Sequence, residues 1–178
     1  MTRQTDRLVL RELSLTDIES IHELHSLPEI DEFNTLGIPE TTQTTKKIVT
    51  EWLTEQNEIP RFSYIFCIDY VDTKQFIGLI AFNLGKQNYK TAEGCYKIHL
   101  NFWRKGYATE ALTKLLDFGF NELKLHRIEA GCAVENIASG KVLEKVGMTK
   151  EGRKKKLPIR GEWKNNYFYA ILKEDFLK

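Results

Sequence analysis

Apolar and polar residues alternate with two different periods along the chain, and each period predicts a kind of element. Runs with every second residue apolar, or rich in Ile, Phe and Tyr, predict strands at residues 8–10, 63–71, 76–84, 93–98, 127–134 and 167–172. Apolar residues three and four positions apart predict helices at residues 16–25, 41–58, 106–120 and 137–146. The polar residues 72–75 between two of the strands indicate a hairpin.

These elements predict a single α/β (α+β) domain over residues 1–178. Its centre would be a mixed, mostly antiparallel sheet of about seven strands, flanked by about four helices. A helix from Gly106 with one apolar face would lie against the sheet. The segment 28–39 is expected to be irregular, because its polar and apolar residues follow neither period.

Short signals mark where some helices begin and end. Thr16 and Glu19 have the spacing of a capping box, in which a hydroxyl and a carboxylate satisfy free backbone N–H groups. Asn136 suits the N-terminal cap of the last helix, and Gly147 suits its end. In the less regular tail that follows, the basic run 153–156 is either a solvated strand or loop face or a site that attracts an acidic substrate or RNA.

Composition narrows the class of protein. The formal net charge of +1 gives no global field for DNA or an anionic membrane. No apolar run reaches the ~20 residues that span a bilayer, and the N-terminus lacks the apolar core of a secretory signal, so a cytoplasmic protein without a membrane partner is expected. Cys67, Cys95 and Cys132 each fall in a predicted strand and are expected to be reduced core thiols.

Two histidines lie three positions apart on the first predicted helix. His22 and His25 would suit two ligands of a metal ion, but no third ligand follows at a matching spacing. We therefore expect surface or partly buried histidines and no metal site.

A turn between a predicted strand and the helix from Gly106 carries the first functional signal. Residues 103–108 hold two cations, Arg104 and Lys105, and a glycine that lets a ligand approach the backbone. Backbone N–H groups at the start of a helix favour an anion such as phosphate. The alternative is an ordinary connection with solvated cations. Neither common nucleotide-binding fingerprint, G-x-x-x-x-G-K-[ST] or G-x-G-x-x-G, occurs in the chain.

Four stretches in the same order resemble the GNAT N-acetyltransferases of the RimJ/RimL-like branch. They are Thr5–Arg11, the run from Glu93 through Trp103–Ala111, the segment His126–Ala130 followed by Asn136–Ser139, and Leu143–Met148 followed by Glu151 and Gly152. The resemblance implies the GNAT fold, with a sheet that is parallel where it splays at the coenzyme. It also implies direct acetyl transfer from acetyl-coenzyme A (acetyl-CoA) to an amine, with no metal and no covalent enzyme intermediate.

The resemblance also assigns residues to acetyl-CoA. Backbone groups of Ile98 and Leu100 would hold the pantetheine arm and polarise the acetyl carbonyl, and Asn136 would contact the pantetheine. The pyrophosphate would lie on the turn, mostly on main-chain N–H groups, with the contributing residues Arg104, Lys105, Gly106, Tyr107, Ala108 and Thr109.

Two side chains are implied to act in catalysis. Glu93 matches a carboxylate that receives the amine proton through water; its alternative role is a charge at a strand edge. Ser139 matches a serine that donates a hydrogen bond to the coenzyme sulfur, and its alternative role is helix capping. Two positions depart from the family. Leu143 stands where many GNAT enzymes have a tyrosine acid. Pro158 stands where RimL-like enzymes have a carboxylate, and Glu162 is close enough in sequence to replace it.

The acceptor is the least determined part. Phe33, Asn34 and Trp52 match the region that contacts substrate, although the residues themselves favour the alternative, core packing and loop. The branch suggests a protein N-terminal amine, such as that of a ribosomal protein. A small amine (polyamine, amino acid or antibiotic) or a non-catalytic CoA-binding regulator are the alternatives, and a homodimer is implied by family habit alone.

Overall fold

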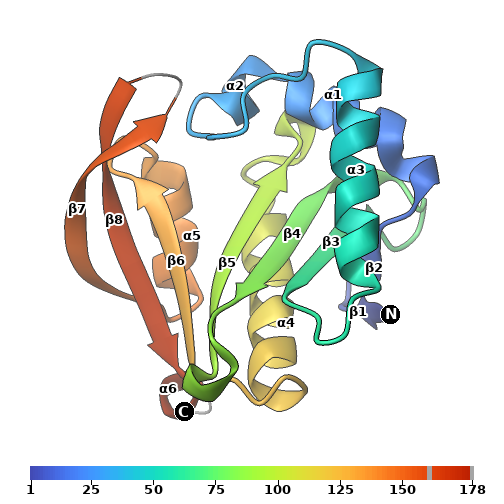
Figure 1. Cartoon of the computed structure of the whole chain (residues 1–178). Coiled ribbons are helices and arrows are strands. Elements are labelled where there is room, and N and C mark those ends of the chain that lie inside the picture. The colour runs from blue at the N-terminus through green and yellow to red at the C-terminus, as the bar shows by residue number, and fades with distance from the viewer. Residues whose placement is uncertain (160–161, 177–178) are drawn as a thin grey trace.

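Eight strands form one sheet with helices on both faces, in a computed structural model that describes residues 1–159 and 162–176, with side chains for 1–153 and 162–176 (Figure 1). The strand order is β1-β2-β3-β4-β5-β6-β8-β7. The predicted mixed, mostly antiparallel sheet is confirmed, with one strand more than expected.

The strands are β1 (Thr2–Gln4), β2 (Leu8–Glu12), β3 (Ser63–Tyr70), β4 (Phe76–Leu84), β5 (Thr91–Ile98), β6 (Arg127–Ala133), β7 (Thr149–Ile159) and β8 (Glu162–Leu172). The helices are α1 (Ile18–Ser26), α2 (Pro28–Asp31), α3 (Thr42–Gln56), α4 (Tyr107–Asn121), α5 (Ile137–Lys145) and α6 (Lys173–Phe176). Short 3-10 turns span Leu15–Asp17, Gln87–Tyr89 and Leu100–Phe102. None of these described helices has the length and apolar character needed to cross a bilayer.

The sheet divides into two halves between β5 and β6. These strands run parallel and pair only through 91–93 on β5 and 127–129 on β6. By contrast, β4 pairs with β5 from Leu84 to Gly78, and β6 pairs with β8 along its whole length. The facing edges of β5 and β6 therefore separate beyond Glu93, as Figure 1 shows, and the expected parallel splay is confirmed.

One apolar cluster lies on each face of the sheet. The larger cluster holds the buried stripe of α4, including Leu112, Leu115 and Phe118, against β4 and β6. The smaller one holds Ile21 of α1 and Val49 of α3 on the opposite face. The predicted amphipathic character of the helix after Gly106 is thus confirmed, and α4 is fixed against the strands that flank the splay.

The tail is more regular than its sequence pattern predicts. Residues 149–159 form β7, and β8 begins at Glu162, five residues before the predicted start of the last strand. Pairing with β8 makes this segment a strand, although its run of charged residues shows no apolar alternation. Lysines on such an edge strand discourage pairing with another chain. The side chains of 154–156, and so most of the basic run, lie outside the described residues.

Three other details correct the sequence prediction. The segment 28–39 contains the short helix α2. At the first helix, the Asp17 carboxylate accepts the Ser14 N–H at 2.8 Å and pairs with Arg11 at 2.7 Å, so Ser14 replaces Thr16 in the capping role. Cys95 is exposed on β5, unlike the buried Cys67 and Cys132.

Candidate functional site

The turn before α4 presents free backbone donors. Gly106 caps the helix with a left-handed φ of 83° and no side-chain hydrogen bond. The first helical bond runs from Glu110 N–H to Gly106 O at 3.1 Å, so the N–H groups of the three preceding residues, 107–109, have no acceptor in the helix. Arg104 and Lys105 are exposed beside them. This geometry fits the predicted phosphate, since unpaired N–H groups and the helix dipole both favour an anion.

An ion pair from the N-terminal strand region braces this turn. Arg7 Nε donates to Glu110 Oε2 at 2.7 Å, and Arg7 Nη1 donates to Lys105 O at 3.1 Å. Thr5 Oγ1 donates to the same carboxylate at 2.5 Å. Burial raises the pKa of Glu110, but the hydrogen bonds from Thr5 and Arg7 outweigh it and leave the pKa below its usual value. Sequence reasoning gave Thr5, Arg7 and Glu110 no role, although two of the four family-like stretches contain them.

The edge of β5 that faces the splay carries unpaired main-chain groups. His99 N–H donates to Ile77 O of the neighbouring strand at 2.8 Å. Because main-chain groups of successive strand residues point to opposite edges, those of Tyr96 and Ile98 point toward β6, where pairing has ended. Trp103 Nε1 donates to Ile98 O at 2.5 Å, which leaves the N–H of Ile98 at this edge.

Leu100, the second predicted backbone contact, lies past the end of β5. It opens a 3-10 turn, and its carbonyl accepts the Trp103 N–H at 3.1 Å. Ile98 therefore lies on the open edge of β5, whereas Leu100 lies between β5 and residues 103–108, here called the anion turn.

Glu93 stands at the point where the sheet divides. It is an exposed residue on β5 and the last to pair with β6, opposite Glu129. Its side chain shares a face of the strand with Lys97, which reaches α1 through a 3.2 Å contact between Lys97 Nζ and His25 Nε2. Glu93 therefore faces the side of the sheet covered by α1 and α3.

The opposite face of the splay carries two linked hydroxyls. Tyr96 OH lies 2.9 Å from Ser139 Oγ in the first turn of α5. Asn136 caps α5 by accepting the Ser139 N–H at 3.0 Å, which confirms its predicted capping role. Burial raises the pKa of Tyr96 to about 12. Sequence reasoning missed Tyr96, and Leu143, at the position of the usual tyrosine acid, is buried in the core.

A polar cluster lies beneath the face of β5 that carries Glu93 and Lys97, here called the acceptor face. His25 is buried, and its ring meets Trp52 edge-on at 6.1 Å between centroids. Burial, with help from the Lys97 charge, lowers the pKa of His25 to about 3. Burial likewise lowers the pKa of Lys97 to about 8. Trp52 therefore packs against His25, which in turn contacts Lys97. The sequence did not indicate either contact.

The segment after α2 reaches the start of β8 across the open end of the splay (Figure 1). Lys164 Nζ lies 5.4 Å from the centre of the Phe33 ring. Asn34 Oδ1 accepts the Leu36 N–H at 3.3 Å, while its amide nitrogen is buried with no hydrogen-bond partner among the described residues. Two predicted acceptor residues, Phe33 and Asn34, therefore lie in a segment that borders the splay, and Glu162 begins the strand opposite them.

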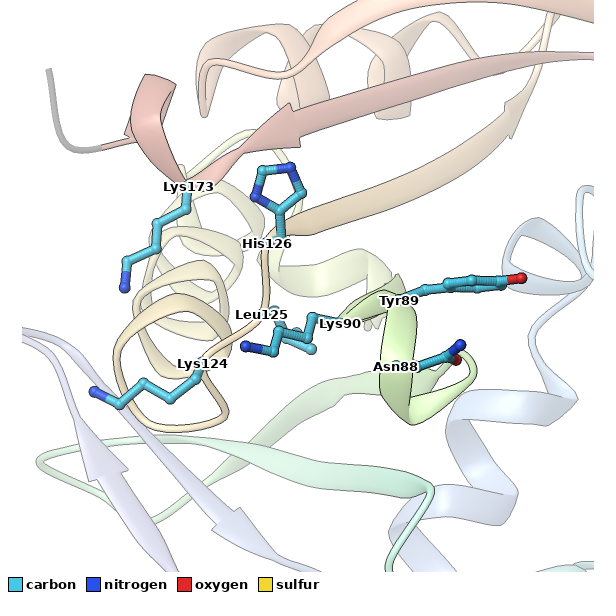
Figure 2. A pocket seen from close by; sticks show the side chains of 7 residues that line it. All are labelled: Asn88, Tyr89, Lys90, Lys124, Leu125, His126 and Lys173. Atoms are coloured by element: carbon cyan, nitrogen blue, oxygen red, sulfur yellow. The ribbon is translucent and has the colours of Figure 1, made fainter.

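A separate cavity of about 500 Å³ lies at the other end of the sheet. It contains none of the predicted site residues; its lining is Asn88, Tyr89, Lys90, Lys124, Leu125, His126 and Lys173. Figure 2 shows its three lysine side chains extending to one side. Because Lys90 and His126 come just before β5 and β6, the cavity lies where these strands begin, whereas the anion turn lies where β5 ends.

Among the described residues, no group of three or more His, Cys, Asp or Glu side chains is arranged to hold a metal ion. The candidate site instead combines unpaired backbone donors, one carboxylate and two hydroxyls. Such a set can bind an extended phosphate-bearing ligand and move protons at its inner end.

Comparison with known proteins gives a consistent picture. A family model described as an acetyltransferase (GNAT) domain matches residues 7–149. The uncharacterized N-acetyltransferase YnaD of Bacillus subtilis (strain 168) is 34% identical over 175 residues, which cover 97% of each chain. The ribosomal protein uS5-alanine N-acetyltransferase of Escherichia coli (strain K12) is 31% identical over 107 residues, 59% of this chain and 55% of that enzyme.

A solved structure extends the likeness to the whole fold. Spermidine N-acetyltransferase from Vibrio cholerae, in complex with CoA and spermine, has a TM-score of 0.86 and 24% identity. The alignment covers 98% of this chain and all of that one.

Proposed function

The chain belongs to the GNAT acetyltransferase family, and on that premise we propose that its acceptor is the N-terminal amine of a protein. This chain is an N-acetyltransferase that uses acetyl-CoA and acts on an amine. The observation that carries the choice of acceptor is the charge on the acceptor face. On β5, Glu93 shares that face with Lys97, and Lys164 borders it beside Phe33. A protein N-terminus brings one ammonium group to Glu93, whose neighbour Glu129 is already paired with Arg127, whereas a polyamine brings several cations toward two lysines.

Acetyl-CoA would lie along the splay. The N–H groups of Tyr107, Ala108 and Thr109, with Gly106, would hold the pyrophosphate, and Arg104 and Lys105 would add charge. The pantetheine amides would pair with the unpaired edge of β5 at Ile98, and Leu100 and Asn136 would contact the same arm. In this arrangement the thioester would lie between Glu93 and Ser139, one on each face of the splay.

The proton path follows from these positions. The acceptor ammonium loses one proton through water to Glu93, because only the free amine can attack the thioester. The amine nitrogen bonds to the acetyl carbon while the main chain of β5 donates to the carbonyl oxygen. The carbon–sulfur bond then breaks, its electron pair stays on sulfur, and the nitrogen loses its second proton to solvent. Ser139 donates to the sulfur, which finally takes up one proton, so the products are an N-acetyl amine, free CoA and one net proton.

Two of the predicted substrate residues would border the acceptor, and the third would act through other side chains. Phe33 and Asn34 would border the entering chain, since both lie in the segment that reaches the start of β8. Trp52 would act through His25, by holding the position of Lys97.

The test is release of free CoA from acetyl-CoA with a panel of N-terminal peptides, spermidine and amino acids. We expect turnover with peptides, identified by mass spectrometry as acetylation of the α-amine. Glu93→Gln should lose most of this turnover, whereas Glu162→Gln should keep it. Turnover with spermidine in preference to every peptide would replace the proposed acceptor by a small amine. Tight CoA binding without turnover on any amine would favour a non-catalytic regulator.

A further inference from the structure

A hydrogen bond joins the two halves of the divided sheet at its open end. Tyr96 lies on β5, past the last residue that pairs with β6, and Ser139 lies on α5, which follows β6. Their hydroxyl oxygens are 2.9 Å apart. Within the chain that the structure describes, neither hydroxyl has another side-chain partner.

The pair of hydroxyls has one O–H group left to donate to a ligand. Each hydroxyl has one hydrogen, and one of the two is used within the pair. Whichever oxygen donates, one O–H group is left to donate to a third atom. Both residues are half-buried, one on each half of the divided sheet, so a ligand between the two halves could accept from this remaining donor.

Both hydroxyls have fixed positions. Ser139 is held by the cap that Asn136 provides to α5, at 3.0 Å. The next residue, Gly140, allows α5 to lie close to β6 and β8, because a Cβ there would be 3.1 Å from Tyr169 OH and 3.9 Å from Cys132 Sγ. The Tyr96 ring is packed against the larger apolar cluster. A donor held in this way loses little entropy when it binds a ligand.

We propose that Tyr96 and Ser139 act as one unit, in which Tyr96 sets the direction of the shared hydrogen bond and the unit donates its remaining O–H to the departing CoA sulfur. The inference rests on the proposed binding of acetyl-CoA along the splay. It adds a residue from β5 to the site and supplies a donor where Leu143 leaves none.

The role is donation of a hydrogen bond, and the proton stays on oxygen. Tyr96, with its pKa raised to about 12 by burial, remains protonated throughout the neutral range. A thiol has a pKa of about 8.5, so full transfer of the Tyr96 proton to the thiolate would be uphill by several pKa units. When the carbon–sulfur bond breaks, the unit therefore stabilises the negative charge on sulfur, and the thiolate takes its proton from water.

The experiment compares Tyr96→Phe, Ser139→Ala and the double variant. Each single variant should lower kcat by about 10- to 100-fold, the usual effect of a hydrogen bond to a charged group, with the KM for acetyl-CoA unchanged. The double variant should be slower than either single one but by less than the product of the two effects, because each single change already leaves the other hydroxyl without the partner that orients it. Tyr64→Phe removes the hydroxyl of another half-buried ring, which meets Phe118 edge-on at 5.3 Å between ring centroids, and should leave kcat unchanged.

A second readout does not depend on turnover. In the complex with free CoA, ultraviolet absorbance of the thiolate gives the pKa of the bound thiol. Tyr96→Phe should raise this pKa by about one unit, since the remaining Ser139 hydroxyl loses the partner that directs its hydrogen bond to the thiolate. An unchanged thiol pKa together with additive effects on kcat would overturn the proposal. Failure of wild-type protein to bind CoA would contradict the proposed function first, whereas tight binding with an unshifted thiol pKa would contradict only the role of Tyr96 and Ser139.

Discussion

At the scale of single residues, the proposed role of Glu93 follows from its position in the sheet. It is an ordinary exposed carboxylate, but it stands where pairing between β5 and β6 ends. An amine that reaches this point meets Glu93, whose neighbour Glu129 is paired with Arg127, and the inner end of the proposed thioester site. A residue two positions further along the same face, Cys95, is exposed as well, but a neutral thiol is a poor acceptor for an ammonium proton.

Glu93→Gln keeps the size of the side chain and removes its basicity. We expect kcat to fall by roughly 10²- to 10⁴-fold, the usual contribution of a general base, and the KM for acetyl-CoA to stay within twofold. Raising the pH should recover part of the loss, because more of the amine is then already deprotonated. Glu129→Gln, which removes a carboxylate that pairs with Arg127 at 2.7 Å on the neighbouring strand, is the matched control. Equal loss in both variants would refute a specific role for Glu93.

Lys97 gives a pH prediction with a definite sign. Its pKa in the folded protein is lowered to about 8 by burial, so between about pH 8 and 10.5 the unfolded chain binds a proton that the folded chain does not. The free energy of unfolding contributed by Lys97 therefore rises with pH across this range. Below about pH 8 the buried ammonium is unfavourable, and Lys97→Met should increase the free energy of unfolding by roughly 1–3 kcal/mol.

Urea unfolding at about pH 7 and about pH 10 measures this difference. The advantage of Lys97→Met should shrink at the higher pH. Lys47→Met, at an exposed position of α3, is the control and should stay within about 0.5 kcal/mol of wild type at both pH values. A gain for Lys97→Met that grows with pH would show that burial does not penalise the Lys97 charge.

At the scale of elements, α4 depends on the N-terminal strand region for the shape of its first turn. Its cap is a glycine with no side-chain hydrogen bond, so the helix itself does little to fix the turn. Arg7 supplies the missing constraint by holding Glu110 and the Lys105 carbonyl together. The anion site is therefore built from two elements far apart in sequence.

Glu110→Gln should loosen this turn. We expect the KM for acetyl-CoA to rise by about 5- to 20-fold with kcat nearly unchanged, and the free energy of unfolding to fall by about 1–2 kcal/mol, because the Arg7 guanidinium loses its charged partner. Asp117→Asn, on the solvent-facing side of the same helix and paired with Lys114 at 3.1 Å, should leave the KM unchanged. A KM unaffected by Glu110→Gln would show that the ion pair between Arg7 and Glu110 does not contribute to coenzyme binding.

The same pair predicts a loss of stability in acid. The pKa of Glu110 is lowered in the folded state, so its contribution is fully present above the unfolded pKa, about 4.3, and is lost as the pH falls through the folded value. The difference in unfolding free energy between wild type and Glu110→Gln should accordingly disappear in strong acid. Unfolding curves at stepwise lower pH give this directly.

At the scale of the whole molecule, the sheet is two half-sheets joined by a short parallel contact. The half with β5 carries Glu93 and the anion turn follows it, whereas the half with β6 leads to α5 and Ser139. A ligand that fills the splay would connect the two halves. Binding should therefore stabilise the entire fold, and its effect should reach residues on both sides.

Amide hydrogen exchange with and without CoA tests this view. In the free protein the N–H groups of Tyr96 and Ile98, which point to the open edge, should exchange faster than those of Cys95 and Lys97, which point to β4. CoA should slow the first pair and leave the second unchanged. At about 100 times its dissociation constant CoA should add about 2.7 kcal/mol, or roughly 5–10 °C in Tm. Protection that appears only near the lysine cavity of Figure 2 would move the binding site there.

The sequence by itself determined the elements whose signals are local. The strand periods, the stripe of α4, the cap at Asn136 and the glycine turn before α4 are readable because burial, capping and backbone freedom depend on residues a few positions apart. The resemblance to a family then singled out Glu93 and Ser139 as candidate catalytic residues.

Only the tertiary structure decided the contacts between distant residues. Arg7 and Glu110 are 103 positions apart, Lys97 and His25 72, and Tyr96 and Ser139 43. β7 likewise becomes a strand through its partner β8, against its own charged pattern. Neither hydrophobic period nor capping signal encodes such pairs, because they arise from the order of strands in the sheet and from the point at which β5 and β6 part. The elements were therefore set locally, and the chemistry of the site was set by how the sheet brings them together.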